Sequence, residues 1–352
     1  MNLKKIFLGT MAGMLLCTNI PVTAFAKKAE VAVYDVETGK EKIRSFDYDD
    51  SDKAEELPPS DGEVTEAGGK VFFHDGDGSV RTLTADKSGR IRIPTSRNLD
   101  GYTFLGWSEV FGQGKNPKYI PGQVMKVKKK AVHLYAVMYN WNEEPDVQVG
   151  NLAGNLSKYS KIIFVGDSRT NYLRKTLLQE YGENALAKVK FISKPGRGLD
   201  WFKEEGEARL RKELSITTVL ERDEPTAVIF NLGVNDLIHR GTLDYKGVTR
   251  EYLSYMNALG RELGNQNCRL FYMSVNPVNT AMKPTRRESE LLYFNAQLKK
   301  GLSENFGWID TYNYLMKNGY STYNAFRGNL DDGVHYSGKT YKRIYKYCMK
   351  SI

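Results

Sequence analysis

Two short polar segments of this 352-residue chain, at 166–168 and 331–336, contain residue types that nucleophilic acyl chemistry requires. The first is Gly166-Asp167-Ser168, which directly follows the apolar run IIFV. A serine at a turn between a strand and a helix is exposed and lies at the positive start of that helix. Such a serine becomes a nucleophile only with a base beside it, and otherwise it commonly caps the helix. Ser168 alone therefore does not establish a catalytic site.

The second segment, DDGVHY at 331–336, contains a histidine that could be this base. Asp332, three residues before His335, can reach back and orient the imidazole ring, whose other nitrogen then faces a serine. Asp331 fits this role less well because its spacing to the histidine is one residue longer. His239 follows Asp236 at the same three-residue spacing, so spacing alone does not separate the two pairs.

Two other loops contain donors that could stabilise an oxyanion. Asn235 follows the apolar segment 226–232, and its amide is a neutral donor at every relevant pH. A donor aimed at a developing oxyanion lowers the barrier by roughly 3 kcal/mol. The segment KPGRGLDW at 194–201 contains Gly196 and Gly198, whose backbone can approach a ligand and donate an N–H. Each of these residues also fits an ordinary role in a turn or a cap.

The polar segments follow a regular alternation of apolar strands and amphipathic helices. This alternation is typical of a parallel sheet with helices on both faces, and the functional sites of such sheets lie at the carboxyl ends of the strands. The predicted strands are 161–165, 189–193, 226–232, 270–275 and 308–310, and the predicted helices are 172–181, 200–214, 249–263, 287–305 and 338–350.

Together, Gly-Asp-Ser, the glycine loop, Gly-x-Asn-Asp and Asp-x-x-His resemble the sequence blocks of the SGNH hydrolase family, the GDSL-like esterases. They occur in the family's order, and the resemblance covers about residues 161–352. It implies an α/β fold with a flavodoxin-like three-layer parallel sheet, and a catalytic triad of Ser168, His335 and Asp332. The family takes its base from the block before the last helix, which favours His335 over His239.

The same resemblance implies an oxyanion hole made by the N–H of Ser168, the amide of Asn235 and the N–H of a loop glycine. Gly198 is preferred and Gly196 is the alternative, because the second block lacks the Ser-Gly form common in the family. The first block also departs from the Gly-Asp-Ser-Leu that named the group, since Arg169 follows the serine. Arg169 could attract an anionic substrate or point into solvent, and we treat it as a candidate substrate-binding residue.

The N-terminal part of the chain differs in composition. Residues 1–26 combine a basic start, an apolar stretch and Ala24-Phe25-Ala26, a pattern that predicts a signal peptide cleaved after Ala26. Residues 27–69 are acidic and contain Pro58-Pro59, which favours a flexible linker. A polar connector is expected at 139–158, followed by the hydrolase domain at 159–352.

Residues 70–138 predict a small β-rich module, because short apolar runs alternate with glycine and proline turns. Its phrases GYTFLGW at 101–107, YIPGQ at 119–123 and LYAV at 134–137 occur in an order that resembles the Listeria–Bacteroides repeat, also called the internalin B-repeat type. This resemblance implies a spacer, a wall-proximal module or a binding module, and not a catalyst.

Charge and cysteine content suggest the surroundings of the protein. The chain has a net charge of +9, but residues 27–67 contain six basic and thirteen acidic residues, so the remainder is strongly basic. A basic extracellular protein favours anionic partners such as cell-wall polymers, and we find no nucleic-acid fold signature. Outside the signal peptide only Cys268 and Cys348 remain, which could pair or be buried. We find no metal-ligand spacing and expect neither metal nor cofactor.

These observations predict a secreted serine esterase that removes O-acyl groups, most of all O-acetyl groups, from a carbohydrate or cell-wall glycan. The same triad would serve a lipase, an esterase of small esters or an O-acyltransferase. The alternative of another class is a non-catalytic extracellular binding or adhesion protein with an inactive hydrolase domain. After the signal peptide, no apolar segment is long enough to predict a transmembrane span.

Overall fold

The computed structural model describes residues 28–35, 40–47, 68–149, 158–215, 225–239, 243–264, 267–324, 326, 328 and 330–352. The expected signal peptide at 1–26 lies outside these residues. The chain divides into two compact units, one up to Asn142 and one from Glu143 onward, and each is described by itself.

The N-terminal unit is built from β-strands, as its turn-rich sequence predicts. Inside the expected linker, β1 (Lys28–Asp35) and β2 (Lys40–Asp47) form an antiparallel hairpin. The main sheet has the order β4-β3-β8-β6, with β3 (Lys70–His74) parallel to β8 (Ala131–Asn140). The other strands are β4 (Val80–Thr84), β6 (Tyr102–Ser108) and the separate pair β5 (Arg90–Arg92) and β7 (Val124–Lys126).

The phrase GYTFLGW forms β6 and carries the core of this unit. Phe104 and Trp107 are buried, and the Trp107 indole N–H donates to the Pro94 carbonyl at 2.8 Å. Gly106 has a φ of 147° at an irregularity in the pairing of β6 with β8. A Cβ at this position would lie 2.4 Å from the Tyr119 carbonyl oxygen, so the turn requires glycine here.

The C-terminal unit contains a five-stranded sheet of order β10-β9-β11-β12-β13 in which all neighbours are parallel. Its strands are β9 (Lys161–Gly166), β10 (Val189–Ser193), β11 (Thr226–Asn231), β12 (Cys268–Met273) and β13 (Phe306–Ile309). Residues of β9 from Ile162 to Val165 are fully buried, as expected for a strand covered on both faces. The predicted fold class is confirmed.

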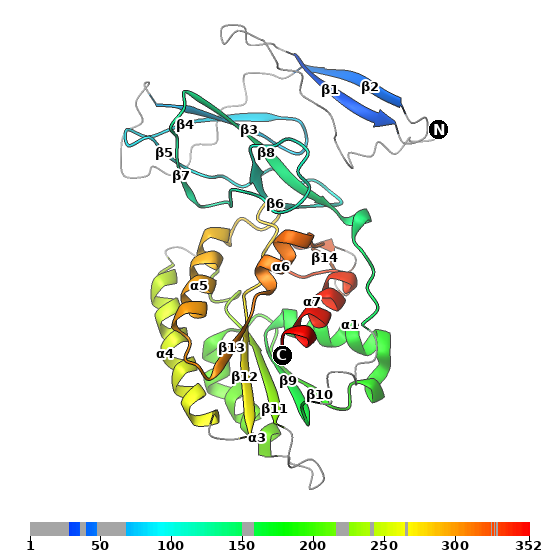
Figure 1. Cartoon of the computed structure of the whole chain (residues 1–352), viewed down its shortest axis with the longest axis vertical. Helices are drawn as coiled ribbons and strands as arrows, with labels where there is room; N and C mark the ends of the chain where they lie inside the picture. Colours follow the sequence, from blue (N-terminus) through cyan, green and yellow to red (C-terminus); the bar gives the residue numbers. More distant parts are fainter. Residues whose placement is uncertain are drawn as a thin grey trace. The chain divides into compact units, whose positions relative to one another are not determined.

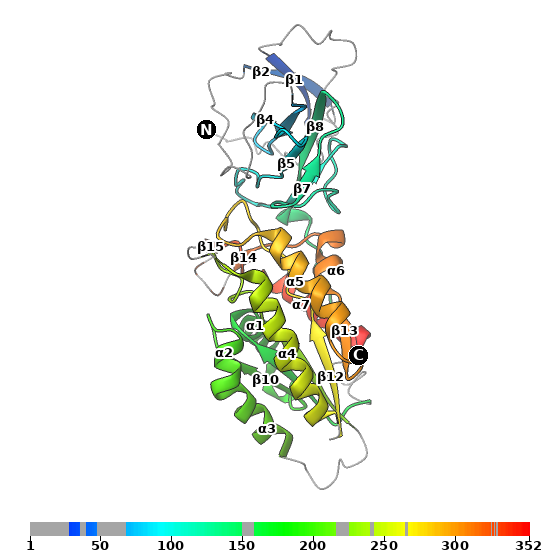
Figure 2. The same cartoon turned by 90° about the vertical axis from the view of Figure 1, so that its left-hand side faces the viewer.

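Helices cover both faces of this sheet (Figures 1 and 2). On one side lie α1 (Ser168–Ala185) and α7 (Gly338–Ser351), which pack together, and on the other lie α4 (Tyr245–Leu263) and α5 (Glu288–Gly301). The remaining elements are α2 (Leu199–Trp201), a π-turn (Phe202–Gly206), α3 (Glu207–Ser215), α6 (Thr311–Asn318) and the short hairpin of β14 (Tyr323–Asn324) and β15 (Leu330–Asp331).

The boundary between the units differs from the expected connector at 139–158. Strand β8 extends to Asn140 and is followed by a 3-10 turn at Trp141–Glu143. Glu144 then packs against α7, where its carboxylate pairs with Arg343 at 2.7 Å and accepts a hydrogen bond from Ser337 at 2.5 Å. Both partners of the ion pair have side chains only 2% exposed. The start of the connector is therefore part of the packed C-terminal unit.

Cys268 and Cys348 are free thiols. Cys348 is buried, with its Sγ 3.4 Å from the Met273 Sδ, whereas Cys268 is half-buried. Burial raises the pKa of both thiols. No helix within the described ranges is both long and apolar enough to cross a membrane.

Candidate active site

The carboxyl end of β9 places Ser168 at the start of α1. Asp167 caps this helix, because its Oδ1 accepts a hydrogen bond from the Arg169 N–H at 2.8 Å. Ser168 is the first helical residue, so its own N–H has no partner inside the helix and belongs to the positive helix end.

The structure brings Ser168, His335 and Asp332 together in one chain of hydrogen bonds. The His335 Nε2 lies 2.7 Å from the Ser168 Oγ, and the His335 Nδ1 lies 2.6 Å from the Asp332 Oδ2. The other oxygen of Asp332 accepts the backbone N–H groups of Val334 at 3.0 Å and His335 at 2.8 Å. The three-residue spacing thus lets the Asp332 carboxylate accept hydrogen bonds from the backbone of the turn and also contact the His335 ring.

Electrostatics keep this carboxylate ionised. Burial by itself would raise the pKa of Asp332, but the hydrogen bonds and the charge of His335 hold the pKa well below its usual range. Ser168 and His335 are 6% and 8% exposed, so their contact is largely shielded from water. An ionised acid, an imidazole and a hydroxyl in this order can move a proton from the hydroxyl to the imidazole.

The rival residues have other partners. The His239 Nε2 lies 2.5 Å from the Glu290 Oε2, and Asp236 accepts hydrogen bonds from the Leu199 N–H at 3.0 Å and the Tyr252 hydroxyl at 2.6 Å. Asp236 and His239 therefore do not form a pair of the kind that their spacing allowed.

Asp331 is also occupied elsewhere. Its carboxylate accepts hydrogen bonds from the Gly333 N–H at 2.8 Å and from the Asn279 amide at 3.4 Å. Burial raises the pKa of Asp331, opposite to the direction at Asp332. Of the two adjacent acids, the one three residues before His335 is the one that contacts the ring.

Asn235 and the glycine loop meet at the same edge of the sheet. The Asn235 Nδ2 donates to the Arg197 carbonyl at 3.0 Å and to the Asp167 Oδ2 at 3.3 Å. Burial raises the pKa of Asp167 to about 6, although the Arg169 charge and N–H oppose this shift. The amide of Asn235 thus lies between the turn that carries Ser168 and the glycine loop.

Gly198 fills a position that no other residue fits. It caps α2, and a Cβ there would lie 2.1 Å from the Asp236 Oδ1. Gly196 instead has a φ of 73° and open space where a Cβ would stand, so it serves the turn itself. Asp236 connects the glycine loop to the loop that carries Asn235, because its carboxylate accepts a hydrogen bond from the Leu199 N–H. The sequence did not indicate this role.

The structure corrects the expectation for Arg169. This residue is 2% exposed, and its guanidinium donates to the carbonyls of Val334 at 2.9 Å, Asn276 at 2.7 Å and Pro277 at 2.9 Å. A buried guanidinium that donates to three backbone carbonyls does not attract an anionic substrate. It joins the turn that carries Ser168 to the loop that carries His335.

Two further residues at the site were missed. Arg286 is 6% exposed and donates to the Val234 carbonyl at 3.1 Å and to the Asn235 Oδ1 at 3.4 Å, which orients the amide. Tyr172 contacts the His335 ring edge to face, with centroids 4.8 Å apart. Helical periodicity from Ser168 could have found Tyr172, whereas no spacing links Arg286 to Asn235. Across the described residues, no group of three or more His, Cys, Asp or Glu could hold a metal ion.

Comparison with solved structures finds several matches to the C-terminal part of the chain. A GDSL-like lipase from Bacteroides thetaiotaomicron is 18% identical, with a TM-score of 0.38 and coverage of 55% of this chain and 89% of that one. A lipase/acylhydrolase from Enterococcus faecalis is 18% identical, with a TM-score of 0.36 and coverage of 54% and 94%. An acetylxylan esterase from Geobacillus stearothermophilus is 17% identical, with a TM-score of 0.36 and coverage of 55% and 93%.

Comparison with curated proteins finds no match. One family model, described as "Protein of unknown function (DUF459)", matches residues 161–351, which is more than half of the chain. The matched range contains all five strands of the parallel sheet and every candidate site residue. It does not reach the N-terminal unit, whose resemblance to the Listeria–Bacteroides repeat stays a prediction. By this match the chain belongs to the DUF459 family.

Proposed function

We propose that the C-terminal unit is a serine esterase that hydrolyses O-acyl esters. The observation that carries this proposal is the pair of contacts from His335, at 2.7 Å to the Ser168 Oγ and 2.6 Å to the Asp332 carboxylate. A base within hydrogen-bond reach of a hydroxyl, and itself oriented by an acid, is the arrangement that activates a serine nucleophile. No cofactor takes part in this reaction.

In the first step, the His335 Nε2 takes the proton of Ser168 while the Oγ attacks the ester carbonyl carbon. Asp332 holds the ring in the tautomer that leaves Nε2 free to accept, and its negative charge stabilises the imidazolium that forms. The imidazolium then gives its proton to the leaving alcohol, and an acyl-enzyme remains on Ser168. In the second step, water gives a proton to His335 as its oxygen attacks the acyl carbon, and the acid leaves when His335 returns that proton to the Ser168 Oγ.

The negative charge on the carbonyl oxygen would be stabilised by the N–H groups of Ser168 and Gly198 and by the Asn235 amide. Both N–H groups lie at the start of helices, which favours an anion there. The Asn235 Nδ2 donates two hydrogen bonds, and the one to Asp167 is the longer at 3.3 Å. We expect the oxyanion to replace Asp167 as the acceptor of this weaker hydrogen bond.

The test compares the wild-type protein with Ser168→Ala on 4-nitrophenyl acetate. We expect turnover by the wild type and none by the variant, because the variant has no nucleophile. A fluorophosphonate probe should label the wild type at Ser168. If the wild type neither turns over the ester nor reacts with the probe, the proposal is wrong, and the non-catalytic binding protein becomes the better explanation.

We further propose an O-acetylated carbohydrate as substrate and an extracellular location, with cleavage after Ala26. The signal-peptide pattern and the basic charge support this choice, and hydrolysis of lipid esters and acyl transfer are the alternatives. Release of acetate from an acetylated glycan, measured beside release from a triglyceride, tests the substrate. A mature protein whose first residue is not Lys27 would contradict the cleavage site.

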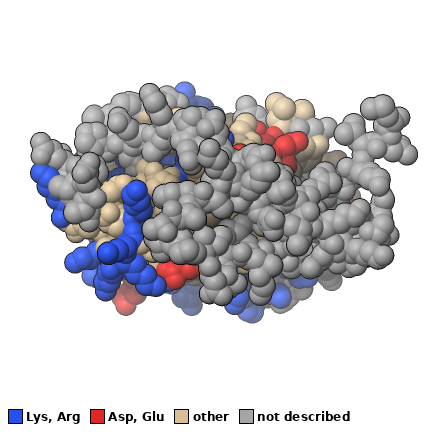
Figure 3. All heavy atoms as spheres, turned by 90° about the horizontal axis from the view of Figure 1, so that it is seen from above, with Lys and Arg blue, Asp and Glu red and all other residues tan. Residues whose placement is uncertain are grey.

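A second proposed function belongs to the N-terminal unit, which we propose binds an anionic polymer. Residues 68–142 contain 12 basic and five acidic residues. A hollow of about 600 Å³ in this unit is lined by five lysines, Lys70, Lys87, Lys128, Lys129 and Lys130, and by Asp86 as its single acid. Lys and Arg side chains also gather at one edge of the face shown in Figure 3.

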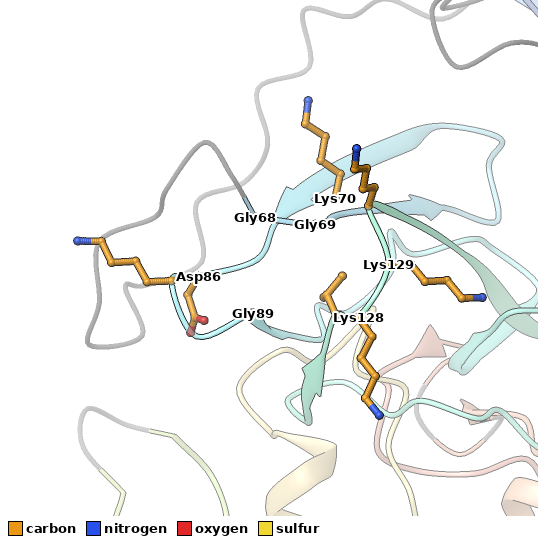
Figure 4. A pocket seen from close by; sticks show the side chains of 10 residues that line it. Gly68, Gly69, Lys70, Asp86, Gly89, Lys128 and Lys129 are labelled. Atoms are coloured by element: carbon orange, nitrogen blue, oxygen red, sulfur yellow. The ribbon is translucent and has the colours of Figure 1, made fainter.

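The lysines around this hollow favour an extended partner. Lys70, Lys128 and Lys129 point away from one another (Figure 4), so their ammonium groups do not converge on one small anion. The carboxylate of Asp86 accepts hydrogen bonds from the N–H groups of Ser88 at 2.9 Å and Arg90 at 2.8 Å, so it is held within its own turn. A chain of repeated phosphate or carboxylate groups can follow such a spread of charge.

Binding of the protein to poly(glycerol phosphate), measured beside neutral dextran, tests this second function. Replacing Lys128, Lys129 and Lys130 together by Glu should abolish binding to the polyanion, and the wild-type affinity should fall with rising salt. Replacing Arg92, Lys115 and Lys118 together by Glu is the matched control, because it changes the net charge by the same amount and none of these residues lines the hollow. Equal loss in the control would show that net charge, and not this site, determines binding.

A further inference from the structure

The first two turns of α1 carry side chains beside the triad that the acyl chemistry does not use. Tyr172 and Lys175 follow Ser168 by four and seven residues, so all three lie on one face of the helix. The Tyr172 ring contacts the His335 ring edge to face, with centroids 4.8 Å apart. This contact places the tyrosine beside the ring of the proposed base.

An aromatic pair and a cation extend from this contact. The Phe326 ring stacks on Tyr172 with centroids 5.9 Å apart and an angle of 27° between the planes. The Lys175 Nζ lies 5.1 Å from the Tyr172 centroid and 5.9 Å from that of Phe326, so the rings hold the ammonium above them. Both rings are half-buried, whereas the lysine is exposed.

The charge of Lys175 is available to a ligand. Within the part of the chain that the structure describes, no carboxylate forms an ion pair with it, in contrast to Lys194 and Lys203, which pair with Glu205 and Glu251. An exposed lysine above an aromatic pair, one ring of which contacts His335, is not needed for packing.

The proposed reaction fixes which part of the substrate reaches this surface. His335 protonates the leaving oxygen, so the leaving alcohol lies against His335 and continues toward Tyr172. Sugar rings pack their C–H groups on aromatic side chains, and an ammonium attracts a carboxylate. We propose that Tyr172, Phe326 and Lys175 form the subsite for the leaving alcohol, and that this alcohol is a sugar that carries a carboxylate. This inference rests on the proposed esterase activity.

Lys175 would thus supply the attraction for an anionic substrate that the sequence suggested for Arg169. The two residues lie on the same helix, but Arg169 is buried among backbone carbonyls and Lys175 is exposed. A carboxylate on the acyl group would lie on the other side of the ester bond, away from Tyr172. The test therefore has to place the charge on each side in turn.

The experiment uses two pairs of esters with the whole protein. The first pair is the monoacetate of methyl glucuronoside and the monoacetate of methyl glucoside, acetylated at the same hydroxyl. The second pair is 4-nitrophenyl hemisuccinate and 4-nitrophenyl acetate, in which only the acyl side gains a charge. We expect the wild type to prefer the glucuronoside over the glucoside by about threefold to fivefold in kcat/KM, as for one partly exposed ion pair. The second pair should show no such preference.

Lys175→Ala should remove this preference, and Lys175→Glu should reverse it. The preference of the wild type should also fall at high salt, because the contact is exposed. Lys190→Ala is the matched control, since Lys190 is an exposed lysine on β10 outside the subsite, and it should keep the wild-type ratio. Tyr172→Leu should raise KM for both glycosides while the ratio between them is retained.

The outcomes separate the two proposals. Suppose that 4-nitrophenyl acetate is hydrolysed but the wild type does not prefer the glucuronoside, or that Lys175→Ala retains the wild-type preference. The proposed subsite is then wrong, and the esterase proposal stands. The wild type could instead prefer the hemisuccinate over the acetate, and Lys175→Ala could remove that preference. Lys175 would then bind a carboxylate on the acyl group, and the proposed subsite for the leaving alcohol would be wrong. If none of the four esters is hydrolysed and the fluorophosphonate probe leaves Ser168 unlabelled, the esterase proposal fails and the subsite fails with it.

Discussion

Replacing Arg169 by leucine, the residue found after the serine in the Gly-Asp-Ser-Leu motif, should destabilise the C-terminal unit and slow its chemistry. In the wild type the guanidinium donates to three carbonyls, at 2.9 Å to Val334, 2.7 Å to Asn276 and 2.9 Å to Pro277. Its carbon atom also lies 4.9 Å from the centroid of the Tyr336 ring. Leucine can fill part of the space but donates nothing, so the buried carbonyls of Val334 and Asn276 lose this donor. The Pro277 carbonyl keeps the hydrogen bond from the Tyr336 hydroxyl at 2.5 Å.

The size of the effect follows from these contacts. A hydrogen bond from a charged donor contributes about 1.5–3 kcal/mol, but the three bonds are not additive, and removing the buried charge relieves its desolvation. We therefore expect a loss of about 3–5 kcal/mol in the free energy of unfolding. For a unit of this size each kcal/mol lowers Tm by about 2–4 °C, so Tm should fall by roughly 10 °C. Because Val334 precedes His335, kcat should fall by about tenfold or more, as a displaced base predicts.

Thermal unfolding followed by circular dichroism, and kcat for 4-nitrophenyl acetate measured well below the Tm of the variant, test both parts. Arg174→Leu is the matched control, because Arg174 is an exposed arginine on the same helix. The control should stay close to the wild type in both measurements. If Arg169→Leu unfolds at the wild-type temperature and retains the wild-type kcat, then the guanidinium does not hold the histidine loop, and the reasoning is wrong.

Three further predictions concern the other groups at the site. Asp332→Asn should lower kcat by about 10⁴-fold with little change in fold, because asparagine favours the wrong tautomer of His335; a kcat within about tenfold of the wild type would contradict this. The pKa of Asp167 is raised to about 6, so its contribution to stability is present below its unfolded pKa and is lost as the pH rises through about 6. In urea titrations the stability of Asp167→Asn relative to the wild type should therefore increase by up to about 3 kcal/mol from about pH 4 to pH 8, and a constant difference would refute the shift. Gly198→Ala should lower both Tm and kcat, because its Cβ would meet the Asp236 carboxylate at 2.1 Å, and a variant with wild-type Tm and kinetics would show that the loop adapts.

The alternation of apolar strands and helices was sufficient to predict the sheet. In a parallel sheet the carboxyl ends of the strands meet at one edge, so segments that follow different strands had to lie close together. Ser168 and Asn235 could be placed near each other for this reason. The i,i+3 spacing similarly predicted that Asp332 could contact His335, and the structure places these side chains 2.6 Å apart.

The sequence could not predict contacts that join distant segments through backbone atoms. Arg169 was expected at the surface because most arginines are exposed, but its acceptors lie 107, 108 and 165 positions away and are carbonyl groups, which every residue has. Arg286 was missed for the same reason, since it orients Asn235 from a loop 51 positions further along. The beginning of the C-terminal unit also could not be predicted, because it is set by the contact of Glu144 with Arg343, 199 positions away.

The buried pair of Glu144 and Arg343 decides where this chain can be cut and rejoined. A swap of N-terminal units at Asn142 leaves both partners on the same fragment, whereas a cut at the expected boundary of 158 leaves Arg343 buried in α7 without its carboxylate. Removing one partner of a buried pair costs about 3–5 kcal/mol, a large part of the stability of a typical domain. Exchange of the N-terminal unit is therefore expected to be tolerated at residue 142 and to destabilise the C-terminal unit at residue 158. Arg343 lies in the second turn of the helix that follows His335, so a joint that leaves it unpaired would disturb the segment next to this histidine.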